Sequence, residues 1–135
     1  MTAAAVWARM QDLVLSRHDR KKAVTETLGL SFIKVKALRK LAAGPLTLGD
    51  LAERLGTDRP YVTLVVDDLE LRGLVSRTMH PTDRRRRLVA VTPAGQEAAA
   101  TAERMLMEPP PSLVALEAGE LAELDRLLTK LDLAG

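Results

Sequence analysis

The sequence predicts a mainly α-helical (α+β) fold, in which a helix-turn-helix and a β-hairpin lie between amphipathic helices at both ends of the chain. Residues 46–92 contain two helical patterns separated by a glycine turn, followed by two segments suited to β-strands. Hydrophobic residues make up 47% of the chain but aromatic residues only 2%, so the core must be mostly leucine, valine and alanine, which favours helices. A chain of 135 residues is long enough for one domain with a real core.

Residues 1–24 predict one long helix with an apolar stripe and a basic end at residues 17–22. The sequence Leu28-Gly29-Leu30 breaks this helix. A second helix is predicted from Ser31, as its N-cap, to Ala42, and Gly44-Pro45 ends it. The stripe of the first helix consists of Val6, Met10, Leu13 and Val14, with Trp7 alongside.

The next stretch predicts two short helices joined by a tight turn. Thr47 can cap the first helix, because its hydroxyl can accept a free backbone N–H. Gly56 ends that helix and Asp58 can cap the next, whose first turn tolerates Pro60 because N–H groups there lack intrahelical partners. Gly73 ends the second helix. The length of the turn and its glycine are typical of a helix-turn-helix.

The second helix of this pair has two different faces. At about 100° per residue, a valine-rich stripe lies on one side, while Tyr61, Leu64 and Leu71 lie away from it. A helix that docks only on its own core rarely has this pattern, so the outer face suits contact with a partner. The inner stripe consists of Val62, Val65, Val66 and Leu69.

Residues 74–79 and 87–91 predict a hairpin, with turn chemistry at residues 80–83. A short extended piece that begins at Leu46 is long enough to add a third strand. Residues 76–87 contain five arginines and one aspartate, which gives a local charge of +4. Four adjacent arginines usually form a solvated loop, but beside a helix-turn-helix they indicate binding to a polyanion.

Thr92-Pro93 begins a further helix, in which threonine is the N-cap and proline takes the first helical position. Pro109-Pro110-Pro111 must end it, since consecutive prolines cannot donate backbone hydrogen bonds. A last helix is predicted over residues 117–132, with a leucine stripe. Such stripes are either ordinary intramolecular core or a surface for a second copy of the chain. We favour a homodimer, because small helix-turn-helix units bind duplex DNA better in pairs matched to a two-fold site.

Several classes of function are not expected. The absence of cysteine excludes disulfides and catalytic thiols, and His18 and His80 are too isolated to predict a metal site. We predict no catalytic residues, no metal and no cofactor. Asp67 and Asp68 point about 100° apart, so they should pair with Arg72 or hairpin arginines rather than form an acid–base site. No apolar run is long enough to span a membrane and no signal peptide is recognisable, so we expect a soluble, cytoplasmic protein.

Two groups of residues are predicted to contact DNA. The N-terminal turns of the second helix would face base edges, and Arg59 could make a bidentate contact with guanine, although it could also contact phosphate or solvent. The hairpin arginines would contact phosphates without reading sequence. The helix residues are Arg59, Pro60, Tyr61, Thr63 and Leu64, and the phosphate-contacting arginines are Arg77, Arg84, Arg86 and Arg87.

The chain resembles the MarR (multiple antibiotic resistance regulator) family of winged-helix transcription regulators over nearly its whole length. Three motifs in register carry the resemblance: Leu51-Ala52-Glu53-Arg54-Leu55, residues 69–75 (LELRGLV), and Asp83 with Arg85 leading to Thr92-Pro93-Ala94-Gly95. The resemblance implies that the second helix enters the major groove and the hairpin, or wing, reaches the minor groove. It also implies that Asp83 orients the wing and that Arg85 enters the minor groove.

The resemblance further implies dimerisation helices at residues 1–30 and 93–135, around a DNA-binding lobe at residues 31–92. A small ligand would bind between the two parts. Cysteine-based oxidation sensing, found in some members of the family, is excluded. Residues that could line the ligand crevice are Trp7, Met10, Phe32, Lys36 and Met105, of which Lys36 would suit an anionic aromatic effector; alternatively, all five are core or surface residues.

We therefore predict a homodimeric regulator that binds a pseudo-palindromic duplex DNA site, as a repressor released by a small molecule. Two alternatives remain: a winged-helix DNA binder without an effector, and a winged-helix module in which the arginines meet an acidic protein. A change in the melting temperature of the protein with any member of a panel of phenolic acids would favour our prediction over the first alternative. Sequence-dependent binding to the DNA upstream of the protein's own gene would eliminate the second.

Overall fold

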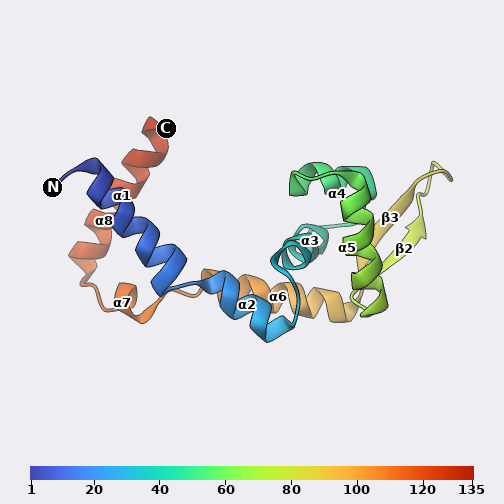
Figure 1. Cartoon of the computed structure of the whole chain (residues 1–135), viewed down its shortest axis with the longest axis horizontal. Coiled ribbons are helices and arrows are strands. Elements are labelled where there is room, and N and C mark those ends of the chain that lie inside the picture. Colours follow the sequence, from blue (N-terminus) through green and yellow to red (C-terminus); the bar gives the residue numbers. More distant parts are fainter.

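The computed structural model describes residues 1–135 and shows an elongated molecule with two dissimilar ends (Figure 1). The two termini lie together at one end, and the helix-turn-helix and the sheet form the other. In chain order the elements are α1 (Ala3–Gln11), the π-helix η1 (Asp12–Arg17), α2 (Arg20–Leu28), α3 (Phe32–Ala42), β1 (Leu46–Thr47), α4 (Leu48–Leu55), α5 (Arg59–Leu71), β2 (Val75–Met79), β3 (Arg87–Val91), α6 (Pro93–Met107), α7 (Pro111–Val114) and α8 (Ala118–Ala134). This confirms the predicted mainly helical fold class.

Side-chain caps fix where α4, α5 and α6 begin. The hydroxyl of Thr47 accepts the Asp50 N–H at 3.1 Å, and the carboxylate of Asp58 accepts the Tyr61 N–H at 2.8 Å. The hydroxyl of Thr92 likewise accepts an amide of the first turn of α6. Each cap satisfies an amide that has no partner within its helix, so the predicted starts of α4, α5 and α6 are confirmed.

The sheet is antiparallel with the strand order β1-β3-β2. Val75 pairs with Val91 and Met79 with Arg87, which places residues 80–86 at the hairpin tip. Leu46 pairs with Val89, so the predicted short third strand is also present. The hairpin is thus attached to the start of α4 as well as to the end of α5.

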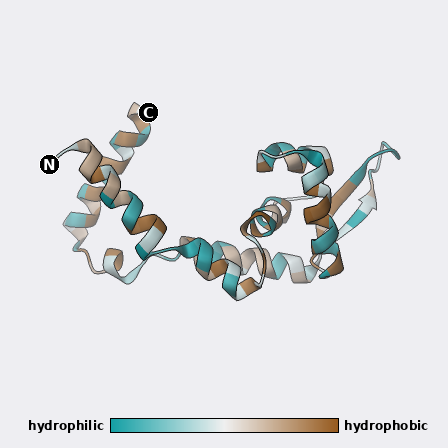
Figure 2. Cartoon of the chain, in the orientation of Figure 1, coloured by the Kyte–Doolittle hydropathy of each residue, from teal (hydrophilic) through white to brown (hydrophobic).

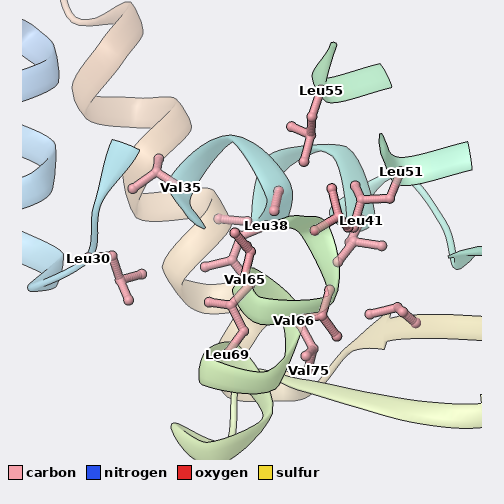
Figure 3. Close-up of a cluster of buried hydrophobic side chains, with 14 of the residues drawn as sticks. Leu30, Val35, Leu38, Leu41, Leu51, Leu55, Val65, Val66, Leu69 and Val75 are labelled. Carbon is pink, nitrogen blue, oxygen red and sulfur yellow. The ribbon is translucent and has the colours of Figure 1, made fainter. Parts of the chain in front are cut away.

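One hydrophobic core of 17 buried residues holds this end of the molecule together (Figure 3). Its members all lie between Val24 and Ala102, and they come from α2 to α6 and the sheet. The valine stripe of α5 is entirely within it. Because Val24 of α2 and Ala99 and Ala102 of α6 belong to this core, the packed lobe extends beyond the expected boundaries at residues 31 and 92.

The first 24 residues do not form the continuous helix that we predicted. α1 passes into the π-helix η1, and the helical path stops at His18, whose φ and ψ are −124° and 55°. Asp19 then caps a new helix, since its carboxylate accepts the Lys22 N–H at 3.0 Å. Aspartate competes with the helix for backbone amides in this way, and this accounts for the break.

The terminal helices α1, η1, α7 and α8 contain no buried residue, although their sequences are amphipathic (Figure 2). The predicted stop at the three prolines is confirmed, because α6 ends at Met107; the short helix α7 that follows was not predicted. Glu117 and Glu120 form a capping box at the start of α8. None of the helices combines the length and apolar composition that a membrane span requires.

Candidate nucleic-acid interface

The interface is built on α5, which α4 and the intervening turn hold against the core. Gly56 ends α4 with φ of +68°, a left-handed conformation that glycine adopts at little cost, and Asp58 caps α5 two residues later. Val62, Val65 and Val66 anchor the inner face of α5 in the core. The helix therefore presents a fixed outer face to solvent.

The residues predicted to read bases lie on this outer face. Tyr61 is 44% exposed and Leu64 is 66% exposed, whereas the valines beside them are buried. Arg59 and Pro60 are exposed at the N-terminal end, while the Thr63 side chain is partly covered and donates a hydrogen bond to the Arg59 carbonyl at 3.1 Å. An exposed tyrosine, leucine and arginine at a helix N-terminus can contact base edges in a groove wide enough for the helix.

The wing tip is shaped by hydrogen bonds from the loop to its own side chains. The Asp83 carboxylate accepts the Arg85 N–H at 3.0 Å, and the Asp83 carbonyl accepts the Arg86 N–H at 3.0 Å. The Arg85 side chain remains 95% exposed. Asp83 thus fixes the backbone of Arg85, and its carboxylate also forms an exposed ion pair with Arg85 Nε at 3.7 Å.

The other wing arginines differ in their surroundings. Arg84 and Arg87 are exposed, whereas Arg86 donates a hydrogen bond to the Thr47 hydroxyl at 3.4 Å, which ties the wing to the start of α4.

The side chain of Arg77, a predicted phosphate contact, is only 21% exposed. It makes ion pairs with Asp67 and with Glu70, the latter at 2.9 Å, both on α5. The two carboxylates more than balance its charge, and the ion pairs hold the wing against α5. The pairing of Asp67 with a hairpin arginine is as expected; the contribution of Glu70 was missed, although it lies three residues from Asp67 on the same helix face.

Asp68 connects α5 to α3 and to the end of α2. Lys34 Nζ lies 2.8 Å from its carboxylate and Arg72 Nε lies 2.7 Å from it, and Arg72 Nη1 also donates to the Gly29 carbonyl at 3.2 Å. The hydrogen bonds from Lys34 and Arg72 lower the pKa of the Asp68 carboxyl below its ordinary value of 3.8. The expected pairing with Arg72 is confirmed; the partner Lys34 was not predicted.

Asp68→Asn should lower the melting temperature at neutral pH. Because the folded-state pKa is depressed, the ionised Asp68 stabilises the fold above its ordinary value of 3.8, and this contribution is lost as the pH falls through the folded-state pKa. Thermal melts of parent and variant should therefore converge on acidification. Asp132→Asn, which removes an exposed carboxylate that makes no ion pair, should change little at either pH. A difference for Asp68→Asn that stays constant down to strongly acid pH would contradict this account.

The five residues predicted to line a ligand crevice lie in different surroundings. Trp7 is 59% exposed on α1. Phe32 and Met105 pack against the core, and Lys21 Nζ lies 4.7 Å from the centre of the Phe32 ring. Met10 lies on α1 and does not join the core, and Lys36 lies among Arg39, Lys40 and Glu103. The break at His18 redirects the first helix, so its apolar residues do not meet α3.

A different cavity, of about 560 Å³, lies where the terminal helices meet α2 and α6. Its charged or titratable side chains are Arg20, His18 and Glu108. The Nε of Arg20 is buried without a hydrogen-bond partner, while its Nη2 donates to the Glu108 carbonyl at 3.0 Å. Apolar residues supply most of the rest, including Leu13, Val14, Leu106, Leu113, Leu116 and Leu124. No group of three or more His, Cys, Asp or Glu side chains is placed to hold a metal ion.

A helix-turn-helix whose second helix is exposed beside an arginine-tipped hairpin defines a winged-helix protein of the DNA-binding class. A family model described as MarR family matches residues 34–86, from α3 to the wing tip. This match identifies residues 34–86 of the chain as a MarR-family region.

The chain is 36% identical over 87 residues to a protein of Thauera aromatica named as a transcriptional regulator for the hcr operon; the match covers 64% of this chain and 52% of that protein. A mutant of MepR from S. aureus superposes with a TM-score of 0.85 at 22% identity, covering 99% of this chain and 98% of the other. A second MepR mutant, bound to an oligodeoxyribonucleotide, gives a TM-score of 0.74 at 23% identity over 99% and 98%. The chain spans about half the length of the curated relatives it matches.

Proposed function

We propose that the chain is a sequence-specific, duplex-DNA-binding transcription repressor that acts in the cytoplasm as a homodimer on a pseudo-palindromic operator. The observation that carries this proposal is the pairing of an exposed recognition helix, α5, with an arginine-tipped wing on one rigid lobe. The MepR mutant bound to an oligodeoxyribonucleotide, which shares the fold, supports DNA as the partner.

In this proposal the N-terminal turns of α5 enter the major groove. Arg59 contacts a guanine, and the apolar side chain of Leu64 contacts a thymine methyl group, as these residue types do in major grooves. Pro60, Tyr61 and Thr63 complete the contact surface. The helix is fixed by its buried valines, so these contacts need little reorganisation on binding.

The wing acts in the adjacent minor groove. Arg85 is the residue that enters it, because its backbone is held by Asp83 while its side chain is 95% exposed, and a narrow A·T minor groove concentrates negative potential. Arg84 and Arg87 are exposed and contact phosphates, whereas Arg86 is partly engaged with Thr47. Arg77 is assigned a bracing role in place of a phosphate contact.

An Arg84→Ala/Arg87→Ala double variant should bind DNA with a flatter salt dependence than the parent. Each phosphate contact that is lost should reduce the slope of log K against log salt by about 0.9, or about 1.8 for both. Fluorescence anisotropy with a duplex from upstream of the protein's own gene, at several salt concentrations, measures the slope. An Arg104→Ala variant, which removes an exposed arginine of α6, should keep the parental slope. Equal slopes for the parent and the double variant would contradict the proposed contacts.

The terminal helices form the proposed dimer interface. α8 presents half-exposed leucines such as Leu127 and Leu128, and α1 presents Val6 and Trp7, with none of them buried within the chain. Apolar stripes that no part of the chain covers need a partner, and a second copy provides one with two-fold symmetry. The two recognition helices would then meet half-sites about one helical turn apart.

We further propose that a small anionic aromatic ligand releases the repressor by binding in the cavity beside Arg20. The unpartnered Nε of Arg20 can bind a carboxylate, while the leucines around it accept an apolar ring. Such a ligand would act by favouring one of two dimer geometries.

A panel of aromatic acids should raise the melting temperature of the parent, and Arg20→Met should abolish that shift. Mutation of Lys36, the cation first expected to bind the effector, serves as the control and should leave the shift intact. If no acid in the panel shifts the melting temperature, or if the Arg20 variant responds like the parent, the effector part of the proposal fails. DNA binding does not depend on that result.

A further inference from the structure

The turn at the wing tip is closed by a histidine ring. The backbone N–H groups of Thr82 and Asp83 both donate to His80 Nδ1, each at 3.2 Å, and the Thr82 hydroxyl lies 3.3 Å from the same nitrogen. At the other end of the turn, the His80 N–H donates to the Arg86 carbonyl at 3.1 Å. The imidazole thus performs the role that an Asn or Asp side chain usually performs in a turn.

These contacts determine the protonation state of the ring. Two amide donors can share Nδ1 only if that nitrogen carries no proton, so the turn requires the neutral imidazole with its proton on Nε2. The imidazolium ion donates from both nitrogens and accepts at neither. A proton on Nδ1 would therefore face two N–H donors, and the turn could not keep this conformation.

The turn held by His80 positions the groups that are proposed to contact DNA. Asp83, whose amide is bound by the ring, itself accepts the Arg85 N–H and the Arg86 N–H. Loss of the His80 contacts would free Asp83 and, with it, the backbone that directs Arg85. The charged groups on the elements around the turn are Asp83, Arg84, Arg85, Arg86 and Arg87 on the wing, with Arg77 held by Asp67 and Glu70 at its base.

We propose that His80 is a positioning residue for DNA binding: its unprotonated Nδ1 holds the wing tip in the conformation that presents Arg85, so acidification loosens the wing. The inference rests on the proposed function, because it assigns the consequence to DNA affinity. The expected loss of affinity on protonation is opposite to the effect of charge alone. A charged His80 in a cluster of arginines would by its charge strengthen binding to a polyanion.

The test compares the parent with His80→Asn and His80→Leu in full-length protein. Asn offers a side-chain oxygen that accepts the same amides at any pH, whereas Leu offers no acceptor. At about pH 8, His80→Leu should bind the operator duplex about three- to tenfold more weakly than the parent, the value of about one hydrogen bond, and His80→Asn should match the parent. On acidification, the parent should weaken relative to His80→Asn, because a proton on Nδ1 removes the acceptor of the two amides.

Amide hydrogen exchange of Thr82 and Asp83 without DNA gives an independent readout. Both amides should be protected in the parent and in His80→Asn at about pH 8, and less protected in His80→Leu. Equal protection in all three proteins, or a parent that gains affinity over His80→Asn on acidification, would overturn the inference. Failure of the parent to bind any duplex while the protection pattern holds would instead overturn the proposed function, leaving His80 as the residue that orders the turn.

Discussion

Gly95→Ala should destabilise the DNA-binding lobe by about 3 kcal/mol and lower its DNA affinity in parallel. A Cβ atom at Gly95 would lie 1.9 Å from the Leu74 carbonyl oxygen and 2.9 Å from its carbon. That carbonyl cannot move freely, because it accepts the Thr92 N–H at 3.0 Å, and the Thr92 hydroxyl donates to the adjacent Gly73 carbonyl at 2.6 Å. The added methyl group would force α6 away from the base of the wing.

Urea unfolding followed by circular dichroism measures this loss. Gly49→Ala is a matched control, since Gly49 also lies in the first turn of a helix of the same lobe but has no atom within 4 Å of its built Cβ. That substitution should be neutral or stabilise the lobe by up to about 1 kcal/mol, because alanine favours helices. Similar stabilities for the two variants would show that α6 can yield at this contact.

Local signals in the sequence were sufficient to predict the central lobe. The caps at Thr47, Asp58 and Thr92 satisfy amides within their own first turns, so neighbouring residues decide them. The valine stripe of α5 follows from helical periodicity alone. The exposed recognition residues could be placed for the same reason, because a helix with one buried face leaves the opposite face outside.

Contacts between distant residues limited the prediction of the site. Arg77 and Glu70 lie on different elements, and only the packing of the wing against α5 brings them together. Arg20 lines the cavity because the helical path stops at His18 and a new helix begins after Asp19. The apolar stripe predicts a continuous helix and does not reveal that the Asp19 side chain caps a new one. The lining of a cavity depends on such angles between helices, which periodicity does not encode.

Disruption of the proposed dimer should have the largest effect on DNA binding. The core of the lobe ends at Ala102, so the terminal helices have no buried contacts of their own. A Leu127→Glu/Leu131→Glu double variant would place two charges on the leucine face of α8, where the side chains are 43% and 59% exposed within one chain. The free energy needed to bury two unpaired carboxylates against a second copy is larger than the free energy gained from the apolar contacts, so the dimer should dissociate.

Affinity for an operator with two half-sites should then fall about 100-fold or more, because the second half-site is no longer engaged by a tethered partner. Binding to a single half-site should be unchanged, since the lobe of residues 24–102 does not include α8. Sedimentation and anisotropy on both duplexes separate these effects. Ala122→Glu/Thr129→Glu adds the same charge to the opposite face of α8, at about 100° per residue, and should remain dimeric. The terminal helices would be excluded as the dimer interface by either of two results. The parent could already be monomeric, or the leucine variant could keep its affinity for the operator with two half-sites.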